Sequence, residues 1–353
     1  MELISLVKTL SSAFGPSGFE DTVSALVKNE MKDMKSLQED TLRNVRCELS
    51  GNTGKRPVMM LDAHLDEVGL IVQAIHENGT MSFLPLGRQA ESSLPANRFL
   101  IKNKDGRCVP AVVAVKPPHF MTEAEKKAPL DISTMVLDCG SHSREETENS
   151  YGIRMAAPAA PDVQCQYDEE HDLFSGKAFD CRIGAAAEIE SMKQLQTAAL
   201  NIDVHAAFSS QEEVGERGVL ANTRAIHPDI AICFEGCPAD DTFTHGAMTQ
   251  TSMGKGPMLR HFDTCMITNP RFQRFALDTA EKYGIPCQES VRAGGGTDGG
   301  IIHLYDVPCI VIGIPVRYIH SSNCYACLKD VTAAADLAVK ICMDLNADII
   351  HSF

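Results

Sequence analysis

A stretch of seven residues with almost no polar side chain, residues 57–63, is the feature that most constrains the fold of this 353-residue chain. Its sequence is PVMMLDA, which is apolar on both of the faces that a strand would have. Such a strand must be covered on both faces, as the central strands of sheets between helices are. The stretch therefore predicts a buried central strand, and His64 follows directly after it.

Strands and helices alternate again in the second half of the chain. Residues 202–208 have the alternating apolar residues of a strand, and residues 230–234 form another apolar run. Helical periodicity predicts helices over residues 183–196 and 214–225. The remaining expected elements are a buried strand over residues 307–314 and a long final helix capped by Asp330. The pattern predicts an α/β fold with a central mixed sheet flanked by helices.

The segment of residues 69–163 has a different character. Short strand-like runs alternate there with turns rich in glycine, proline and asparagine, and few helical periods occur. A structureless segment of roughly 95 residues is improbable inside a folded chain. We therefore expect a small β-rich domain, inserted into an α/β domain that consists of residues 1–68 and 164–353.

The composition excludes several kinds of partner. Asp plus Glu number 47 against 32 Lys plus Arg, which gives a net charge of −15 and argues against nucleic acid and anionic membranes. The N-terminus lacks the features of a signal peptide, and no apolar stretch reaches the roughly 18 residues of a membrane span. The 13 cysteines are scattered along the sequence and do not have the regular spacing of a disulfide framework. We therefore expect free thiols and a cytoplasmic protein.

Five residues able to bind a metal ion stand at or just beyond the ends of expected strands. They are His64, Asp180, Glu213, Glu235 and His320. Two imidazoles and three carboxylates suit zinc, cobalt or manganese. Two ions about 3.5–4 Å apart need a carboxylate that bridges them. Each residue alone is more often structural or solvated, but their joint placement favours a metal centre.

Two further carboxylates have expected roles beside this set. Asp66 follows His64 by two residues and is placed to accept the other ring N–H of that imidazole. Glu212 precedes Glu213 and is left free to act as the general base for a metal-bound water.

Several ordered motifs resemble one family over nearly the whole chain. They are AHLDEVG at residues 63–69, GKAFDCRIG at 176–184, QEEVGERG at 211–218, Glu235, and RYIHS at 317–321. Together they are similar to the co-catalytic metalloaminopeptidases of the tetrahedral-assembly type. That family includes glutamyl and deblocking aminopeptidases and proteins once labelled endoglucanase M. The resemblance implies a zinc-peptidase-like fold, with the β-rich insertion as a dimerisation domain.

The resemblance also implies a role for each residue of the site. Asp180 would bridge two divalent ions, and Glu212 would activate water to attack the first peptide carbonyl. The other ligands would be His64 and Glu235 at one ion, and Glu213 and His320 at the second. The family's substrates are short peptides with a free α-amine, and its members assemble from dimers into dodecamers.

Three positions depart from the family pattern. Glu235 stands where the family usually has aspartate, and residues 321–324 read SSNC in place of the usual sequence. Cys181 replaces the second aspartate of the usual DDR sequence; it is either a thiol ligand or, as we favour, a small buried residue. The family resemblance predicts a cis peptide bond between Asp180 and Cys181.

Candidate substrate-binding residues lie outside the ligand set. The glycine-rich residues 294–300 lack the lysine of a phosphate-binding loop, and we expect them to form a wall of the substrate pocket with Thr297 and Asp298 nearby. His245, which follows Glu235 along the chain, is either a pocket residue or a structural histidine.

The leading hypothesis from the sequence is a dinuclear-metal aminopeptidase. One alternative is another metal-dependent amidohydrolase, such as a deacylase or carboxypeptidase, and the altered Glu235 keeps it open. A second alternative is a catalytically silent peptide-binding homologue, suggested by the changes at Cys181 and at residues 321–324.

Overall fold

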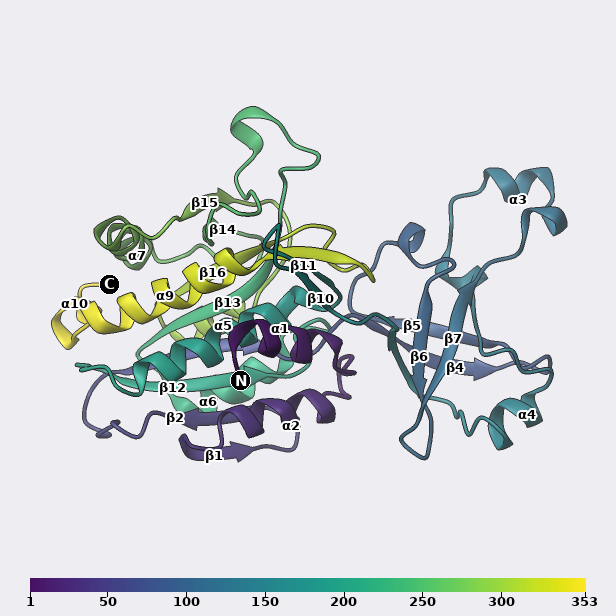
Figure 1. The fold of residues 1–353 in the computed structure, drawn as a ribbon, viewed down its shortest axis with the longest axis horizontal. Coiled ribbons are helices and arrows are strands. Elements are labelled where there is room, and N and C mark those ends of the chain that lie inside the picture. Colours follow the sequence, from purple (N-terminus) through teal and green to yellow (C-terminus); the bar gives the residue numbers. More distant parts are fainter.

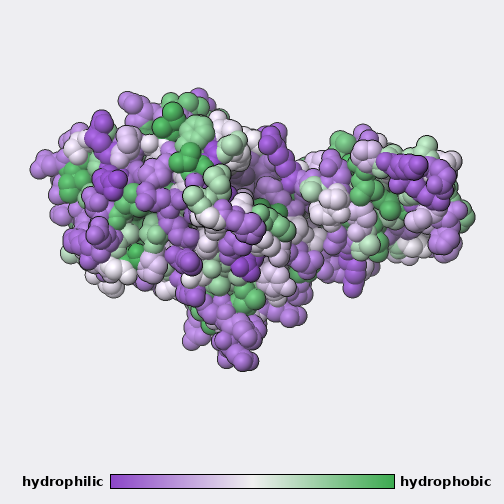
Figure 2. Space-filling view, turned by 90° about the horizontal axis from the view of Figure 1, so that it is seen from above, coloured by the Kyte–Doolittle hydropathy of each residue, from purple (hydrophilic) through white to green (hydrophobic).

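The computed structural model describes residues 1–353, and its two parts are an α/β body and a smaller barrel of strands that extends from one side of it (Figure 1). Both parts are visible in the space-filling view, where hydrophobic residues form small patches on a mainly hydrophilic face (Figure 2). This architecture confirms the predicted fold class. None of the helices combines the length and the apolar character that crossing a membrane requires.

The body is built on a mixed sheet of eight strands in the order β1-β2-β12-β3-β13-β16-β14-β15. The expected central strand is β3 (Val58–His64), which pairs in parallel with β12 (Asp203–Ser209) and β13 (Ile230–Pro238). β16 (Cys309–Val316) is parallel to β13 on its other side. The outer strands are β1 (Lys35–Glu39), β2 (Val45–Glu48), β14 (Met258–Phe262) and β15 (Gln288–Val291). The carboxyl ends of four parallel strands therefore lie along one edge of the sheet.

Helices cover both faces of this sheet, which explains why β3 is almost entirely apolar before His64, with Asp62 as its one charged side chain. Met59 and Leu61 face the larger core, which contains α5 (Phe179–Leu195), α1 (Leu3–Ser12) and α9 (Leu328–Asp344). Met60 faces a smaller core under α6 (Arg217–Ile226) and α8 (Gly299–Ile302). The remaining helices of the body are α2 (Asp21–Glu30), α7 (Pro270–Tyr283) and α10 (Ala347–His351).

The inserted part is a closed barrel with its own hydrophobic core. Its strands are β4 (Gly69–Ile75), β5 (Met81–Leu86), β6 (Arg98–Lys102), β7 (Cys108–Ala114), β8 (Val136–Asp138) and β9 (Pro158–Pro161), and the short helices α3 (Glu123–Lys127) and α4 (Arg144–Asn149) lie in its connections. The strand pairs are antiparallel, and Phe99 and Val113 are among the fully buried side chains inside. Closure leaves the barrel without an unpaired edge.

A small three-stranded sheet lies within the second segment of the body, which follows the barrel in sequence. Its strands are β10 (Gln166–Asp168), β11 (Leu173–Gly176) and β17 (Cys324–Cys327). Gly176 pairs with Cys324, so the segment that leads to Asp180 is held beside the loop that contains His320.

Two local expectations are wrong. The helix expected over residues 214–225 begins only at Arg217, because Glu216 has a left-handed backbone conformation (φ 53°) and its N–H is donated to the Glu212 carbonyl in a turn. Asp330 does not cap the final helix, whose N-cap is Cys327; its carboxylate instead accepts the N–H groups of Gly254 and Gly256.

The barrel core gives a direct test of the fold. Phe99→Ala should lower the free energy of unfolding by about 3–5 kcal/mol, because it removes a completely buried ring and leaves a cavity. Phe120→Ala is the matched control: its ring is 73% exposed, and the change should stay within about 0.5 kcal/mol. Urea denaturation measures both, and equal losses would contradict the assigned barrel interior.

Candidate metal centre

The sheet topology brings the expected ligands to one place. His64 is the last residue of β3, the two glutamates follow β12, and Glu235 lies within β13. Asp180 is in the first turn of α5, and His320 lies in the loop between β16 and β17. Since the parallel strands end at the same edge, residues far apart in sequence converge there, as they do in open α/β sheets.

Asp180 is at the middle of this cluster. Its Oδ1 lies 3.0 Å from Nε2 of His64, and its Oδ2 lies 3.0 Å from Nε2 of His320. Each imidazole therefore approaches a different oxygen of the same carboxylate. That is the disposition a carboxylate needs if it is to be shared between two neighbouring cations.

Donor atoms form three overlapping groups, in each of which the atoms lie within 4.8 Å of one another. One group has His64, Asp180, Cys181 and Glu235, and another has Asp180, Glu213 and His320. The third has His64, Glu212 and Glu213. The first two share Asp180, so the five predicted ligands all lie together.

Burial opposes the ionisation of most carboxylates in this cluster. Burial raises the pKa of Glu212 to about 8 and raises the pKa of Glu213 and of Glu235 well above the usual range, with Asp180 adding repulsion. Burial also opposes ionisation of Asp180, but hydrogen bonds with His320 and His64 hold its pKa below the usual range. Oε1 of Glu213 is buried without any hydrogen-bond partner. Buried carboxylates are normally paired or bind a metal, so this donor set fits divalent cations.

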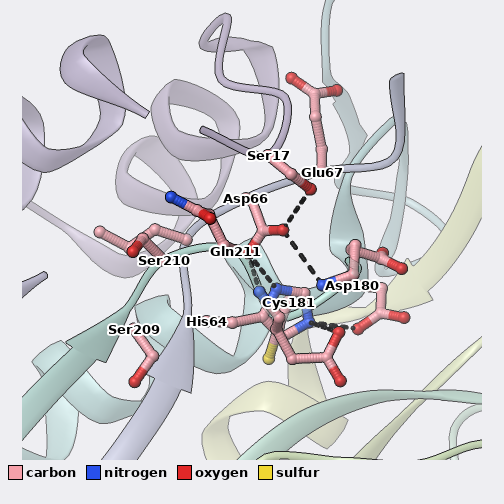
Figure 3. Close-up of polar contacts among 12 residues, drawn as sticks. Ser17, His64, Asp66, Glu67, Asp180, Cys181, Ser209, Ser210 and Gln211 are labelled. Carbon is pink, nitrogen blue, oxygen red and sulfur yellow. Dashed lines mark hydrogen bonds and ion pairs between the residues drawn. The ribbon is translucent and has the colours of Figure 1, made fainter. Parts of the chain in front are cut away.

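Asp66 holds the glutamate loop in place. Its carboxylate accepts the backbone N–H groups of Glu212 (2.9 Å) and Glu213 (3.1 Å) and the hydroxyl of Ser17 (2.5 Å) (Figure 3). Nδ1 of His64 lies farther away, 3.4 Å from Oδ1 of Asp66. The expected contact with the imidazole is therefore long, and the shorter contacts of Asp66 orient the two glutamates.

A buried ionic group that the sequence analysis did not assign supports the start of α5. Lys177 lies 2.6 and 2.7 Å from the two carboxylate oxygens of Glu67, and Arg182 lies 3.5 Å from one of them. Arg182 also donates to the carbonyls of Leu10 and Gly15. The bond between Asp180 and the next residue, which this group flanks, is cis as predicted. The available sequence signal was the presence of these charged residues in the motifs at residues 63–69 and 176–184.

A cavity of about 660 Å³ opens beside the cluster. Thr297 lines it, and the hydroxyl of Thr297 is buried without a partner. Asp298 is buried next to the lining, and both of its carboxylate oxygens also lack partners. His245 is exposed and does not line the cavity. The cavity is also lined by three arginines that the sequence alone did not single out, Arg88, Arg260 and Arg292.

Fold and site together define an α/β protein with a candidate metal centre, and comparison with known proteins identifies the family. A family model described as M42 glutamyl aminopeptidase matches residues 44–337, and the chain belongs to this family. It is 30% identical over 353 residues to the glutamyl aminopeptidase of Lactococcus lactis subsp. cremoris, covering 99% of this chain and 98% of that protein. It is 31% identical over 348 residues to the lysyl aminopeptidase of Pyrococcus furiosus, covering 97% of each.

Solved structures agree with this assignment. The TET aminopeptidase of the marine sediment archaeon Thaumarchaeota archaeon SCGC AB-539-E09 superimposes with a TM-score of 0.95 at 34% identity, over 99% of this chain and 98% of that chain. The TET1 peptidase of Pyrococcus horikoshii, described as able to assemble into a tetrahedron or a large octahedral shell, gives a TM-score of 0.87 at 26% identity, over 98% and 100%. The chain is therefore an aminopeptidase, and the predicted family is confirmed.

Metal binding should stabilise the protein measurably. At a zinc or cobalt concentration 100 times the dissociation constant, the free energy of unfolding should rise by about 2.7 kcal/mol. Asp180→Asn should remove most of this gain, because it weakens the group that both sets of donors share. Asp278→Asn, at an exposed position of α7, is the control and should keep the gain. Thermal denaturation with and without the ion measures the effect; an undiminished gain in the Asp180 variant would contradict the assigned site.

Proposed function

We propose that the protein is a dinuclear-metal aminopeptidase that removes the first residue from short peptides. The observation that carries the proposal is the Asp180 carboxylate, which contacts His64 and His320 through separate oxygens while Glu212 stands beside them. No other cluster of side chains in the fold combines two imidazoles with a shared carboxylate.

In this proposal the two cations have distinct ligands. His64 and Glu235 would hold one ion, Glu213 and His320 would hold the other, and Asp180 would contribute to both sites. Bound there, zinc, cobalt or manganese ions supply Lewis acidity for the scissile carbonyl and lower the pKa of water. The free α-amine of the substrate is the group that distinguishes an aminopeptidase substrate at such a centre.

Glu212 is the proposed general base. Its carboxylate is not among the hydrogen-bonded groups of the loop. One carboxylate oxygen lies 3.9 Å from Nε2 of His64, at the edge of the donor cluster, and Glu212 lines the cavity. In the metal-free protein, burial raises the pKa of Glu212 to about 8. Glu212 would take a proton from the attacking water and give it to the leaving amine. Asp66 fixes the orientation of Glu212 through the backbone.

The cavity is the proposed site for the first residue of the peptide. Its volume of about 660 Å³ lies within the usual range for small-ligand sites, and Thr297 offers it an unpaired hydroxyl. Asp298, which is buried next to the lining of the cavity, would hold the segment that contains Thr297 in place. We do not assign His245 to substrate binding, because it is exposed outside the cavity.

The proposal extends to assembly and location. The barrel would mediate dimers that build a dodecamer. This is supported by the match to the structure of PhTET1-12s, described as a dodecamer in the asymmetric unit, at a TM-score of 0.86 and 26% identity. Free cysteines throughout the chain are consistent with action in the reducing cytoplasm.

Glu212→Gln should abolish most turnover while leaving the metal content unchanged. We expect kcat to fall by about 10²–10⁴, the usual contribution of a general base, because the amide cannot accept the proton. Glu169→Gln, in the exposed turn after β10, is the control and should behave as wild type. Turnover of an aminoacyl amide, with metal analysis of the same samples, measures this. Retained turnover in the Glu212 variant would reject the proposed base.

The free amine separates aminopeptidase action from the two alternatives. A peptide whose α-amine is acetylated should not be cleaved, whereas its unblocked twin should lose its first residue. Mass spectrometry of the products decides: removal of the acyl group or of the last residue would favour a deacylase or a carboxypeptidase. A metal-loaded protein that leaves both peptides intact would favour the silent homologue.

A further inference from the structure

Cys181 lies among the metal-binding donors rather than apart from them. Its Sγ belongs to a group with one donor atom each from His64, Asp180 and Glu235, all within 4.8 Å of one another. Figure 3 shows Cys181 beside His64 and Asp180. The group around His320 has only three donors. One sulfur, one imidazole and two carboxylates make four protein ligands, the number that a closed tetrahedral zinc site has.

The position of this sulfur is tightly constrained. Cys181 is completely buried, and its thiol donates to the Phe234 carbonyl at 3.0 Å, on the residue that precedes Glu235. A β-carbon at position 184 would collide with Sγ, so Gly184 provides the space that the thiol occupies. The sulfur is therefore held between β13 and the first turn of α5, on the side where Glu235 lies.

We propose that Cys181 is a sulfur ligand of the cation that His64, Asp180 and Glu235 hold, and that it makes this position selective for zinc, cobalt or cadmium over manganese or magnesium. The inference rests on the proposed dinuclear function. Thiolate prefers softer ions, whereas carboxylates and carbonyls suit manganese and magnesium. On metal binding, the Cys181 thiol would release its proton to solvent, and its sulfur would exchange the hydrogen bond to the Phe234 carbonyl for the cation.

This assignment makes the two metal positions unequal. The position with Cys181 would offer four protein donors, the number found in structural zinc sites. The position with Glu213 and His320 has three nitrogen or oxygen donors and leaves room for water or substrate, as catalytic sites do. We therefore expect the first equivalent of metal to enter the position with the sulfur.

The test is a cobalt titration of the metal-free, full-length protein, followed by absorbance and by direct metal analysis. Wild type should bind two equivalents and show a sulfur-to-cobalt charge-transfer band in the near ultraviolet that is complete after the first. Cys181→Ala should lack the band and bind the first equivalent at least about 10-fold more weakly, since even residues that only orient a ligand have effects of that size. Cys342→Ala removes an equally buried thiol of α9 and should keep the band.

Wild type alone provides a second measurement that does not depend on how the variants fold. X-ray absorption of the protein with one zinc equivalent should show a zinc–sulfur distance of about 2.3 Å. Two bound equivalents without any sulfur signal would overturn the role of Cys181 and leave the proposed function standing. A band that persists in Cys181→Ala would assign the sulfur to another cysteine and also overturn it. Failure of wild type to bind cobalt would contradict both proposals.

Discussion

The contact of one aspartate with two imidazoles is the interaction on which the rest of the structure depends. Asp180 comes from the first turn of a buried helix, His64 from the end of a central strand, and His320 from a loop near the C-terminal end of the sheet. The two contacts span 116 and 140 residues of sequence. A sheet whose parallel strands end at the same edge brings such distant positions together there.

The surroundings of Asp180 show how this contact is held. Lys177 and Arg182 flank it in sequence, and both are anchored by the buried carboxylate of Glu67, which lies three residues beyond His64. A buried ion pair contributes little net stability, but removal of one partner is costly, so such a group favours one arrangement of the chain. The group thus couples the position of the first turn of α5 to the end of β3. Asp66 couples the glutamate loop to the same strand end.

Local sequence patterns predicted much of this structure, because the determinants were themselves local. The apolar runs before His64 and Glu235 are buried on both faces. A strand's own residues are enough to predict this, because a strand that is apolar on both faces must be covered on both. The ligand set followed from residue types at strand ends and from the family resemblance. The carboxylates of Asp66 and Asp330 were assigned incompletely or wrongly, because their partners lie 146 and 74–76 residues away. The arginines of the cavity could not be predicted for the same reason: Arg88 and Arg292 meet there only after folding.

Whether Asp180 is shared by two metal ions is tested most directly by anomalous diffraction from crystals of the full-length protein soaked in zinc. If two cations share this carboxylate, we expect two peaks about 3.5–4 Å apart, one beside each oxygen of Asp180. A single peak, or two peaks without Asp180 between them, would contradict this sharing.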